Sequence, residues 1–327
     1  MNDKLVMISL LLTVILSQSR RVFLSIFFVS YLSINSKFRK AVLISGGAHR
    51  FIFREANFAF ENDTDVFIFL YNDSSAQVWV PSSKSPQVPY LVSENSVVPY
   101  FHSKGANYVH YNVIDIPRER KKLDTALGQE YLYRYTNKFL RKVEWQPHSI
   151  MLLLRHYAYM AAINYERIHS DFFKYSHFLY QREDNVYISA APMIIPIIPT
   201  LEPYLLYNDT VPLVVASKYC PWGGLSDKIF FANRLGAEIL FANSYRKFVS
   251  NMRLWVKGED NFNMTNSADH MVTEDLIRRL LVKSGVVVET NEFFRTELRY
   301  VEGTLCIQAI YAKCGPLGFD QNFTTCV

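Results

Sequence analysis

The sequence predicts an α/β fold with a largely parallel β-sheet, preceded by an N-terminal hydrophobic segment. Two observations predict this fold. Short apolar segments that end in turn-forming residues alternate with segments of helical periodicity along the chain. Several of these short segments are apolar without interruption, as in strands buried on both faces of a parallel sheet. A chain of 327 residues is also long enough to bury a large core without a disulfide or metal.

The composition narrows the class of protein. Half of the residues are hydrophobic and 15% are aromatic, which excludes an intrinsically disordered chain. Glycine and proline are sparse, so a fibrous or low-complexity protein is also excluded. The formal net charge of +5 is small and dispersed along the chain, so it does not indicate a nucleic-acid partner.

The N-terminal segment contains two apolar runs, residues 5–17 and 22–34, separated by a short polar stretch with Arg20 and Arg21. Each run has 13 residues, fewer than the roughly 20 that a membrane-spanning helix needs. The arginines before the second run favour a signal anchor with its carboxyl end translocated. A cleaved signal peptide and a buried helical hairpin are the alternatives. We therefore predict an anchor in residues 1–36 and one catalytic domain in residues 37–327.

Glycosylation signals and cysteines favour a lumenal location for that domain. Five Asn-x-Ser/Thr sequons occur, at Asn62, Asn72, Asn208, Asn263 and Asn322. The cysteines form an even set, namely Cys220, Cys306, Cys314 and Cys326. Two disulfides with three possible connectivities are expected, and free core cysteines of a cytosolic protein are the alternative. Together with the anchor, these features predict a single-pass type II membrane protein of the endoplasmic reticulum or Golgi lumen.

The first half of the predicted domain begins with a β-α-β unit. Residues 41–45 and 65–71 are apolar strands, and residues 50–61 between them have helical spacing. With no hairpin signal between the strands, the unit is expected to be parallel. Further strands are predicted near residues 96–100 and 107–113, followed by a charged helix within residues 117–143.

The second half continues the alternation. A helix with one apolar stripe is expected over residues 148–168, and prolines exclude a regular helix in residues 192–207. The remaining predicted elements are strands 176–180, 212–217 and 286–289, and helices 226–243 and 273–284.

Candidate site residues follow the predicted strands, because ligands of open parallel sheets bind beyond the carboxyl ends of the strands. The first strand ends at Ser45 and is followed by Gly46, Gly47 and, three residues later, Arg50. A glycine pair lets the backbone approach a ligand closely, and an arginine can pair with a diphosphate. The alternative is an ordinary turn with a solvated arginine. No P-loop, dinucleotide-binding, G-x-S-x-G or H-E-x-x-H motif is present.

A second cluster, Arg182-Glu183-Asp184, follows the strand at residues 176–180. A carboxylate at a strand end can ligate Mg²⁺ or Mn²⁺, which in turn bridges phosphate oxygens. A surface charge cluster at a turn is the alternative.

Two predicted helix starts provide further candidates. Gly223 and Gly224 precede Asp227, where backbone N–H groups could hold an anion or an acceptor hydroxyl. Asp227 is equally suited to stabilise a helix dipole. Asp275 follows Thr273 at the start of a later helix, where a capping role is the alternative.

In this order the motifs resemble a divergent group of GT-A-type glycosyltransferases over residues 40–290. The matching stretches are AVLISGGAHRF, YSHFLYQREDNVYIS, WGGLSDKIFFANR and TEDLIRRLLVKSGVVV. The resemblance implies a GT-A-like, Rossmann-type, mostly parallel sheet flanked by helices. It implies transfer of a sugar from a nucleotide-sugar donor to a glycan or glycoprotein acceptor.

The same resemblance implies roles for individual residues. Asp184 resembles the metal-binding acid of GT-A folds, with Mn²⁺ or Mg²⁺ as the expected cofactor. The usual D-x-D motif, however, is replaced by Arg182-Glu183-Asp184, so basic residues such as Arg50 are the alternative means of neutralising the leaving diphosphate. The implied donor-binding residues are Ser45, Gly46, Gly47, Arg50 and Arg182. The implied acceptor-binding residues are Trp222, Gly223 and Gly224, and the implied catalytic carboxylates are Asp227 and Asp275.

Two other functions are compatible with these residues. One is an inactive lumenal carbohydrate-binding or assembly protein of the same fold. The other is a lumenal hydrolase that uses Glu183 or Asp184 together with Asp275 as paired carboxylates.

Overall fold

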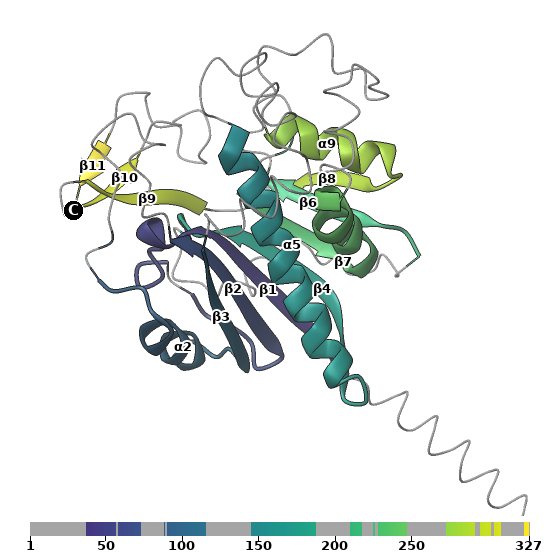
Figure 1. Cartoon of the computed structure of the whole chain (residues 1–327), viewed down its shortest axis with the longest axis horizontal. Helices are drawn as coiled ribbons and strands as arrows, with labels where there is room; N and C mark the ends of the chain where they lie inside the picture. The colour runs from purple at the N-terminus through teal and green to yellow at the C-terminus, as the bar shows by residue number, and fades with distance from the viewer. Residues whose placement is uncertain are drawn as a thin grey trace, which may run out of the picture.

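The structure is a computed structural model (Figure 1). It describes residues 37–56, 58–72, 88, 90–115, 145–187, 210–217, 225, 228–246, 273–291, 295–301, 304–308 and 324–326. The predicted anchor in residues 1–36 and the predicted helix in residues 117–143 lie outside these ranges. Within them, no helix is long and apolar enough to cross a membrane.

The main sheet has seven strands in the order β3-β2-β1-β4-β7-β6-β8. Strand β7 runs antiparallel to both of its neighbours, and every other neighbouring pair is parallel, which confirms the predicted mostly parallel sheet. The strands are β1 (Lys37–Gly47), β2 (Thr64–Asn72), β3 (Tyr108–Asp115), β4 (Phe173–Arg182), β6 (Leu213–Ser217), β7 (Ile229–Asn233) and β8 (Val287–Asn291).

Helices cover both faces of this sheet (Figure 1). Alternate side chains of the central strands point to opposite faces, so Leu43 and Phe67 enter one core and Val42 and Val66 enter the other. The first core contains residues of α5 (Trp145–Ile168), α7 (Arg234–Ala237), the π-helix η3 (Glu238–Asn243) and α9 (Thr273–Lys283). The second core contains residues of α2 (Glu94–Ser103) and of segment 51–60.

A second, four-stranded antiparallel sheet was not predicted. Its strands are β5 (Asn185–Tyr187), β9 (Arg295–Val301), β10 (Thr304–Gln308) and β11 (Thr324–Cys326), in the order β11-β10-β9-β5. Cys306 and Cys326 occupy opposite positions in the β10–β11 register. Among the three possible disulfide connectivities, the register is therefore compatible with the one that joins these two residues.

The helix predicted over residues 50–61 is wrong. A short 3-10 helix, η1 (Ala48–Arg50), is followed by turns, and both Phe51 and Phe53 pack against Phe101 with ring centroids 6.3 and 6.4 Å away. In an α-helix, residues two apart point about 200° away from each other, so these two rings could not share one partner. Tertiary packing of the aromatic side chains therefore prevails over the helical spacing.

The strand predicted near residues 96–100 is also wrong, because these residues belong to α2. A capping box formed by Ser93 and Ser96 starts this helix, and Val97 and Phe101, four residues apart, are buried on its inner side. The cap and this i, i+4 pair outweigh the strand preference of the local valines.

The helix predicted over residues 226–243 begins later than expected. Residues 229–233 form β7, which is buried on both faces between β4 and β6. The helical part starts only at Arg234, after Asn233, whose side chain accepts a hydrogen bond from the Gly236 N–H at 2.8 Å. Asp227 therefore precedes a strand in the chain, and the expectation that it begins a helix is corrected.

The other predicted elements that fall on described residues are confirmed. They are the strands β1, β2, β3, β4, β6 and β8 and the helices α5 and α9.

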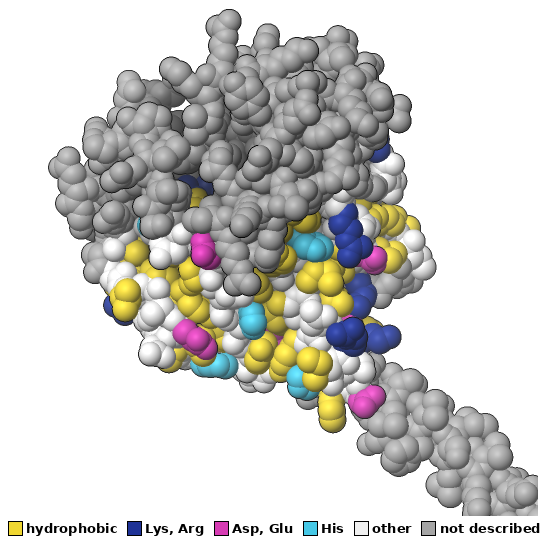
Figure 2. Space-filling view, viewed as in Figure 1, with side chains coloured by type: hydrophobic (Ala, Val, Ile, Leu, Met, Phe, Trp, Pro, Cys, Tyr) yellow, Lys and Arg dark blue, Asp and Glu magenta, His cyan; other side chains and the backbone are white. Residues whose placement is uncertain are grey.

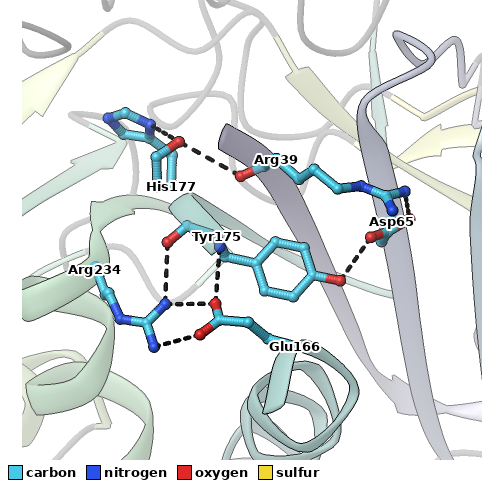
Figure 3. Close-up of polar contacts among 7 residues, drawn as sticks. Arg39, Asp65, Glu166, Tyr175, His177 and Arg234 are labelled. Carbon is cyan, nitrogen blue, oxygen red and sulfur yellow. Dashed lines mark hydrogen bonds and ion pairs between the residues drawn. The ribbon is translucent and has the colours of Figure 1, made fainter. Parts of the chain in front are cut away.

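A buried polar network joins the elements at the amino ends of β1, β2 and β4 (Figure 3). Asp65 of β2 pairs with Arg39 of β1 and accepts a hydrogen bond from the Tyr175 hydroxyl of β4 at 2.6 Å. The Tyr175 backbone N–H donates to Glu166 of α5 at 2.7 Å, and Arg234 of α7 binds the same carboxylate through two N–H groups at 2.5 and 2.7 Å. This network fixes three strands and two helices relative to one another.

The surface around this end of the sheet has exposed apolar residues. Phe38, Ile168 and Phe172 are all exposed, and they lie at the start of β1, at the end of α5 and in the α5–β4 connection. Lysine and arginine side chains gather on one side of the face in Figure 2, whereas acidic side chains are scattered over it. The sequon residues Asn62 and Asn72 are both exposed, as glycosylation requires.

Replacing Phe101 by alanine is expected to lower the free energy of unfolding by about 3–5 kcal/mol, because the ring is fully buried among four phenylalanines. Phe172→Ala is the matched control. Since Phe172 is 72% exposed, its loss is expected to stay within about 0.5 kcal/mol. Urea unfolding followed by circular dichroism measures both, and equal losses would contradict the described core.

Candidate functional site

The candidate site lies where the strand order of the main sheet reverses. Strand β1 pairs with β2 on one side, and the chain continues outward to β3 before it returns through α5 to β4 on the other side of β1. Such a switch point is where ligands of open α/β sheets bind, at the carboxyl ends of the strands. Ser45 lies opposite Arg182 in the β1–β4 register, and the Glu183 N–H donates to the Ser45 carbonyl at 3.2 Å. The two clusters predicted from the sequence therefore meet.

Gly46 allows this meeting. Its φ is +149°, and a Cβ atom placed on it would lie 1.7 Å from Oε2 of Glu183. Gly46 therefore permits a close approach to its backbone, whereas the expected approach of a ligand to the glycine pair stays a prediction. The group that approaches is a carboxylate of the protein itself.

Two arginines pair with the two carboxylates of the cluster. Arg50 Nη2 forms an ion pair with Glu183 Oε1, and Arg50 Nη1 lies 3.7 Å from Asp184 Oδ2. Arg182 Nη2 donates to the same Asp184 oxygen at 2.7 Å. Asp184 is thus flanked by two guanidinium groups, one from each side of the β1–β4 junction.

Burial divides the cluster into two layers. The side chains of Glu183 and Asp184 are 0% and 1% exposed, whereas those of Arg50 and Arg182 are 19% and 13% exposed. The solvent-accessible atoms of this ionic cluster therefore belong to the arginines, and the carboxylates lie beneath them. The part of the cluster that solvent reaches therefore belongs to cationic side chains, and guanidinium groups bind carboxylate or phosphate oxygens.

The pKa values of the cluster are shifted because its members are buried away from water. Burial raises the pKa of the Glu183 carboxyl above its ordinary range, while the charge of Arg50 opposes the shift. Burial by itself lowers the pKa of Arg50, but Glu183 and Asp184 together raise it by more, so it lies above the usual arginine value. Arg50 therefore stays charged at every pH at which the protein is folded.

Ser45 belongs to the floor of the site. Its side chain is fully buried, and its hydroxyl lies 3.1 Å from the Tyr180 hydroxyl. The Tyr180 ring in turn lies 4.5 Å from the guanidinium of Arg155 of α5, itself only 1% exposed. In this structure Ser45 holds β1 against β4 below the arginines.

Sequence reasoning missed several of these residues. Tyr180 and Arg155 lie within a strand and a helix that the sequence predicted, but an apolar pattern does not reveal which polar residues lie under a site. Tyr71 is opposite Gly47 in the β1–β2 register and packs edge-on against His49 at 6.1 Å. The only signal for Tyr71 is its position at the end of a buried strand, next to the turn at residues 72–75.

The residues at the switch point do not favour a divalent cation. Oδ2 of Asp184, the expected metal ligand, faces two guanidinium groups, and Glu183 is held by Arg50. In the part of the chain that the structure describes, no three His, Cys, Asp or Glu side chains gather as a metal site would require. The metal expected at Asp184 stays a prediction.

Several predicted site residues fall outside the described ranges, namely Trp222, Gly223, Gly224 and Asp227. Asp275 lies in the first turn of α9, and its side chain is not among those described. Lys228, next to Asp227 in the chain, accepts a hydrogen bond from the Arg182 N–H through its carbonyl at 2.9 Å. The WGGLSDK stretch therefore ends directly beside the arginine–carboxylate cluster.

No protein-family profile and no curated protein matches this sequence. Among solved structures, mouse xyloside xylosyltransferase 1 in its apo form is similar at 9% identity and a TM-score of 0.38, over 78% of this chain and 85% of that one. The glycosyltransferase GlyE of Streptococcus pneumoniae TIGR4 is similar at 10% identity in two crystal structures, with TM-scores of 0.32 and 0.34. These matches also cover 78% of this chain but only 46% and 45% of the GlyE chains. Such low scores carry no functional conclusion, which must come from the residues of this chain.

Gly46→Ala is expected to destabilise the protein more than Gly285→Ala does. Both glycines have positive φ, but a Cβ on Gly285 meets nothing within 4 Å, so that variant is expected to lose only about 1 kcal/mol. The clash with Glu183 adds about 1–3 kcal/mol at Gly46. Thermal and urea unfolding of both variants test this, and a Gly46 loss no greater than the Gly285 loss would refute the packing of Glu183.

Arg50→Gln is expected to lower the free energy of unfolding by about 3–5 kcal/mol, because Glu183 then lacks its charged partner while fully buried. The matched control is Arg54→Gln, four residues along the chain. Arg54 is exposed and stacks over the Tyr90 ring at 4.7 Å, so the control should lose about 1 kcal/mol or less. Chemical denaturation measures both, and similar losses would show that the Arg50–Glu183 pair contributes little.

Proposed function

We propose that this chain is a glycosyltransferase that uses a nucleotide-sugar donor, and that the donor diphosphate binds at the carboxyl ends of β1 and β4. One observation carries the proposal: two partly exposed arginines lie over buried carboxylates at the switch point of a mostly parallel sheet. The sheet is consistent with the GT-A-like fold that the sequence motifs imply. Arg50 and Arg182, predicted as donor-binding residues, come together there from positions 132 residues apart.

The chemistry of sugar transfer matches an arginine-lined site. The bond between the anomeric carbon and the phosphate oxygen breaks, and the departing nucleoside diphosphate takes the bonding electron pair. Guanidinium N–H groups next to that oxygen stabilise the developing negative charge. The acceptor hydroxyl oxygen forms the new bond to the anomeric carbon.

The acceptor hydroxyl must also lose its proton. For an inverting reaction a carboxylate takes this proton, and Asp227 and Asp275 are the residues that we propose for the role. Trp222, Gly223 and Gly224 are proposed for the acceptor side. The backbone hydrogen bond between Lys228 and Arg182 brings the residue that follows Asp227 in the chain next to Arg182, which supports this proposal.

The proposed cellular setting follows from the first 36 residues. We propose that residues 1–36 anchor the chain in the membrane with the catalytic domain in the lumen of the endoplasmic reticulum or Golgi. Glycan or glycoprotein acceptors are found there. The exposed sequons at Asn62 and Asn72 support this setting.

The hydrolase alternative is less well supported. Paired carboxylates that act on a glycosidic bond must reach the substrate, but Glu183 and Asp184 are buried under arginines. An inactive carbohydrate-binding protein would have the same fold as the proposed glycosyltransferase, so only an experiment distinguishes the two.

The test is release of nucleoside diphosphate by the purified full chain from a panel of uridine, guanosine and cytidine nucleotide sugars, with glycan acceptors. Turnover with at least one donor is expected. Absence of both binding and turnover with every donor would refute the proposal. Glycan binding without donor turnover would favour the inactive protein, and glycan cleavage without a nucleotide donor would favour the hydrolase.

Arg182→Gln is expected to weaken donor binding about 10- to 100-fold, the effect of losing a hydrogen bond to a charged group of about 1.5–3 kcal/mol. Arg54→Gln, whose arginine stacks over the Tyr90 ring and takes no part in the ion pairs that Glu183 and Asp184 form with Arg50 and Arg182, is expected to bind the donor as the natural chain does. Titration calorimetry with the active donor compares the two. Equal affinities would remove Arg182 from the donor site.

A further inference from the structure

Asp184 occupies the sequence position at which a metal-binding acid is expected, yet its surroundings are those of an anion already paired with cations. Its Oδ2 atom lies 2.7 Å from Arg182 Nη2 and 3.7 Å from Arg50 Nη1. A divalent cation bound to this oxygen would face two guanidinium charges at short range, and like charges repel most strongly where water is excluded. The side chain is 1% exposed, so water does not screen the repulsion.

Glu183 does not provide a second metal ligand. Its carboxylate packs against Gly46, where no side chain would fit, and pairs with Arg50. Arg182 occupies the position of the first acid of a D-x-D motif, so a negative charge is replaced by a positive charge at this position. Arg182 thus takes the place of a metal ligand, and Arg50 supplies positive charge where a metal ion would supply it.

The layering of the cluster shows what the arginines can do. They are its solvent-accessible members, and the carboxylates hold them from below. A guanidinium has five N–H donors in a planar fork, and such forks bind phosphate oxygens as well as carboxylates. Arg50 at the end of η1 and Arg182 at the end of β4 therefore form an oriented pair of diphosphate-binding groups.

We propose that Arg50 and Arg182 take the place of a divalent cation at the β1–β4 switch point, so that this chain binds the diphosphate of its donor without Mn²⁺ or Mg²⁺. This inference rests on the proposed function, of which it specifies the donor site. The buried carboxylates Glu183 and Asp184 act as positioning residues that orient the two guanidinium groups.

The test is titration calorimetry of uridine diphosphate and guanosine diphosphate binding to the purified full chain, in excess EDTA and in Mn²⁺. At least one nucleotide is expected to bind with the same affinity, within about twofold, under both conditions. Binding that is seen only with Mn²⁺, or that is more than tenfold tighter with Mn²⁺, would overturn the inference. That same result would leave the proposed glycosyltransferase function intact.

Three variants make the test specific. Arg182→Gln is expected to weaken nucleotide binding at least tenfold in EDTA without rescue by Mn²⁺, whereas Arg54→Gln is expected to bind normally. Asp184→Asn is expected to weaken binding by the same factor in EDTA and in Mn²⁺, because the aspartate orients a guanidinium group and holds no metal. A loss of affinity confined to the Mn²⁺ condition would overturn the inference.

Failure of the proposed function gives a different pattern. In that case neither nucleotide binds in EDTA or in Mn²⁺, and no nucleotide sugar is turned over. The wild-type comparison needs no substitution, so it remains decisive even where Arg50→Gln or Arg182→Gln fails to fold.

Discussion

The parallel pairing of β1 with β4 sets the arrangement of the main sheet and of the candidate site. It begins at Lys37 and Phe173 and continues to Ser45 and Arg182, with one irregularity near Arg39. At one end the pairing places Arg39, Asp65 and Tyr175 in a buried polar network; at the other it brings two strand ends together. Because the strands are parallel, every residue that follows β1 or β4 leaves the sheet at the same edge. The candidate site is a consequence of that geometry.

The site combines close backbone approach with buried charge. Gly46 has no side chain, so the Glu183 carboxylate lies against its backbone. Arg50, four residues later in the chain, forms an ion pair with this carboxylate. Buried ion pairs of this kind contribute little net stability, but they are costly to break, which gives them strong control over geometry. Arg182 and Asp184 repeat the arrangement on the other strand. The result is a fixed pair of guanidinium groups over two buried carboxylates, with the cationic groups nearer to solvent, which suits an anionic ligand better than a cation.

Most of the main sheet could be predicted from the sequence because its strands are buried on both faces. Continuous apolar runs such as residues 41–45 and 65–71 have few other stable positions in a globular protein. The failures occurred where side chains from distant segments decide the local structure. Phe51 and Phe53 both pack on Phe101, which excludes a helix, and residues 229–233 enter the sheet between β4 and β6 although their spacing also fits a helix. The second sheet was missed because its strands, three to seven residues long, have no distinctive pattern.

The class of fold and the segments that carry the site can be predicted from the amino-acid sequence, because apolar periodicity and turn residues act locally. The sequence identified Gly46, Arg50, Arg182 and Asp184 as neighbours of strand ends. Which of these residues meet, and in what electrostatic state, depends on how the strands pair and which side chains are buried. Register places Ser45 opposite Arg182, and burial places the carboxylates below the arginines. The order of charged residues along the chain does not show which side chains are buried. Burial and strand pairing determine whether Asp184 faces a metal ion or a guanidinium group.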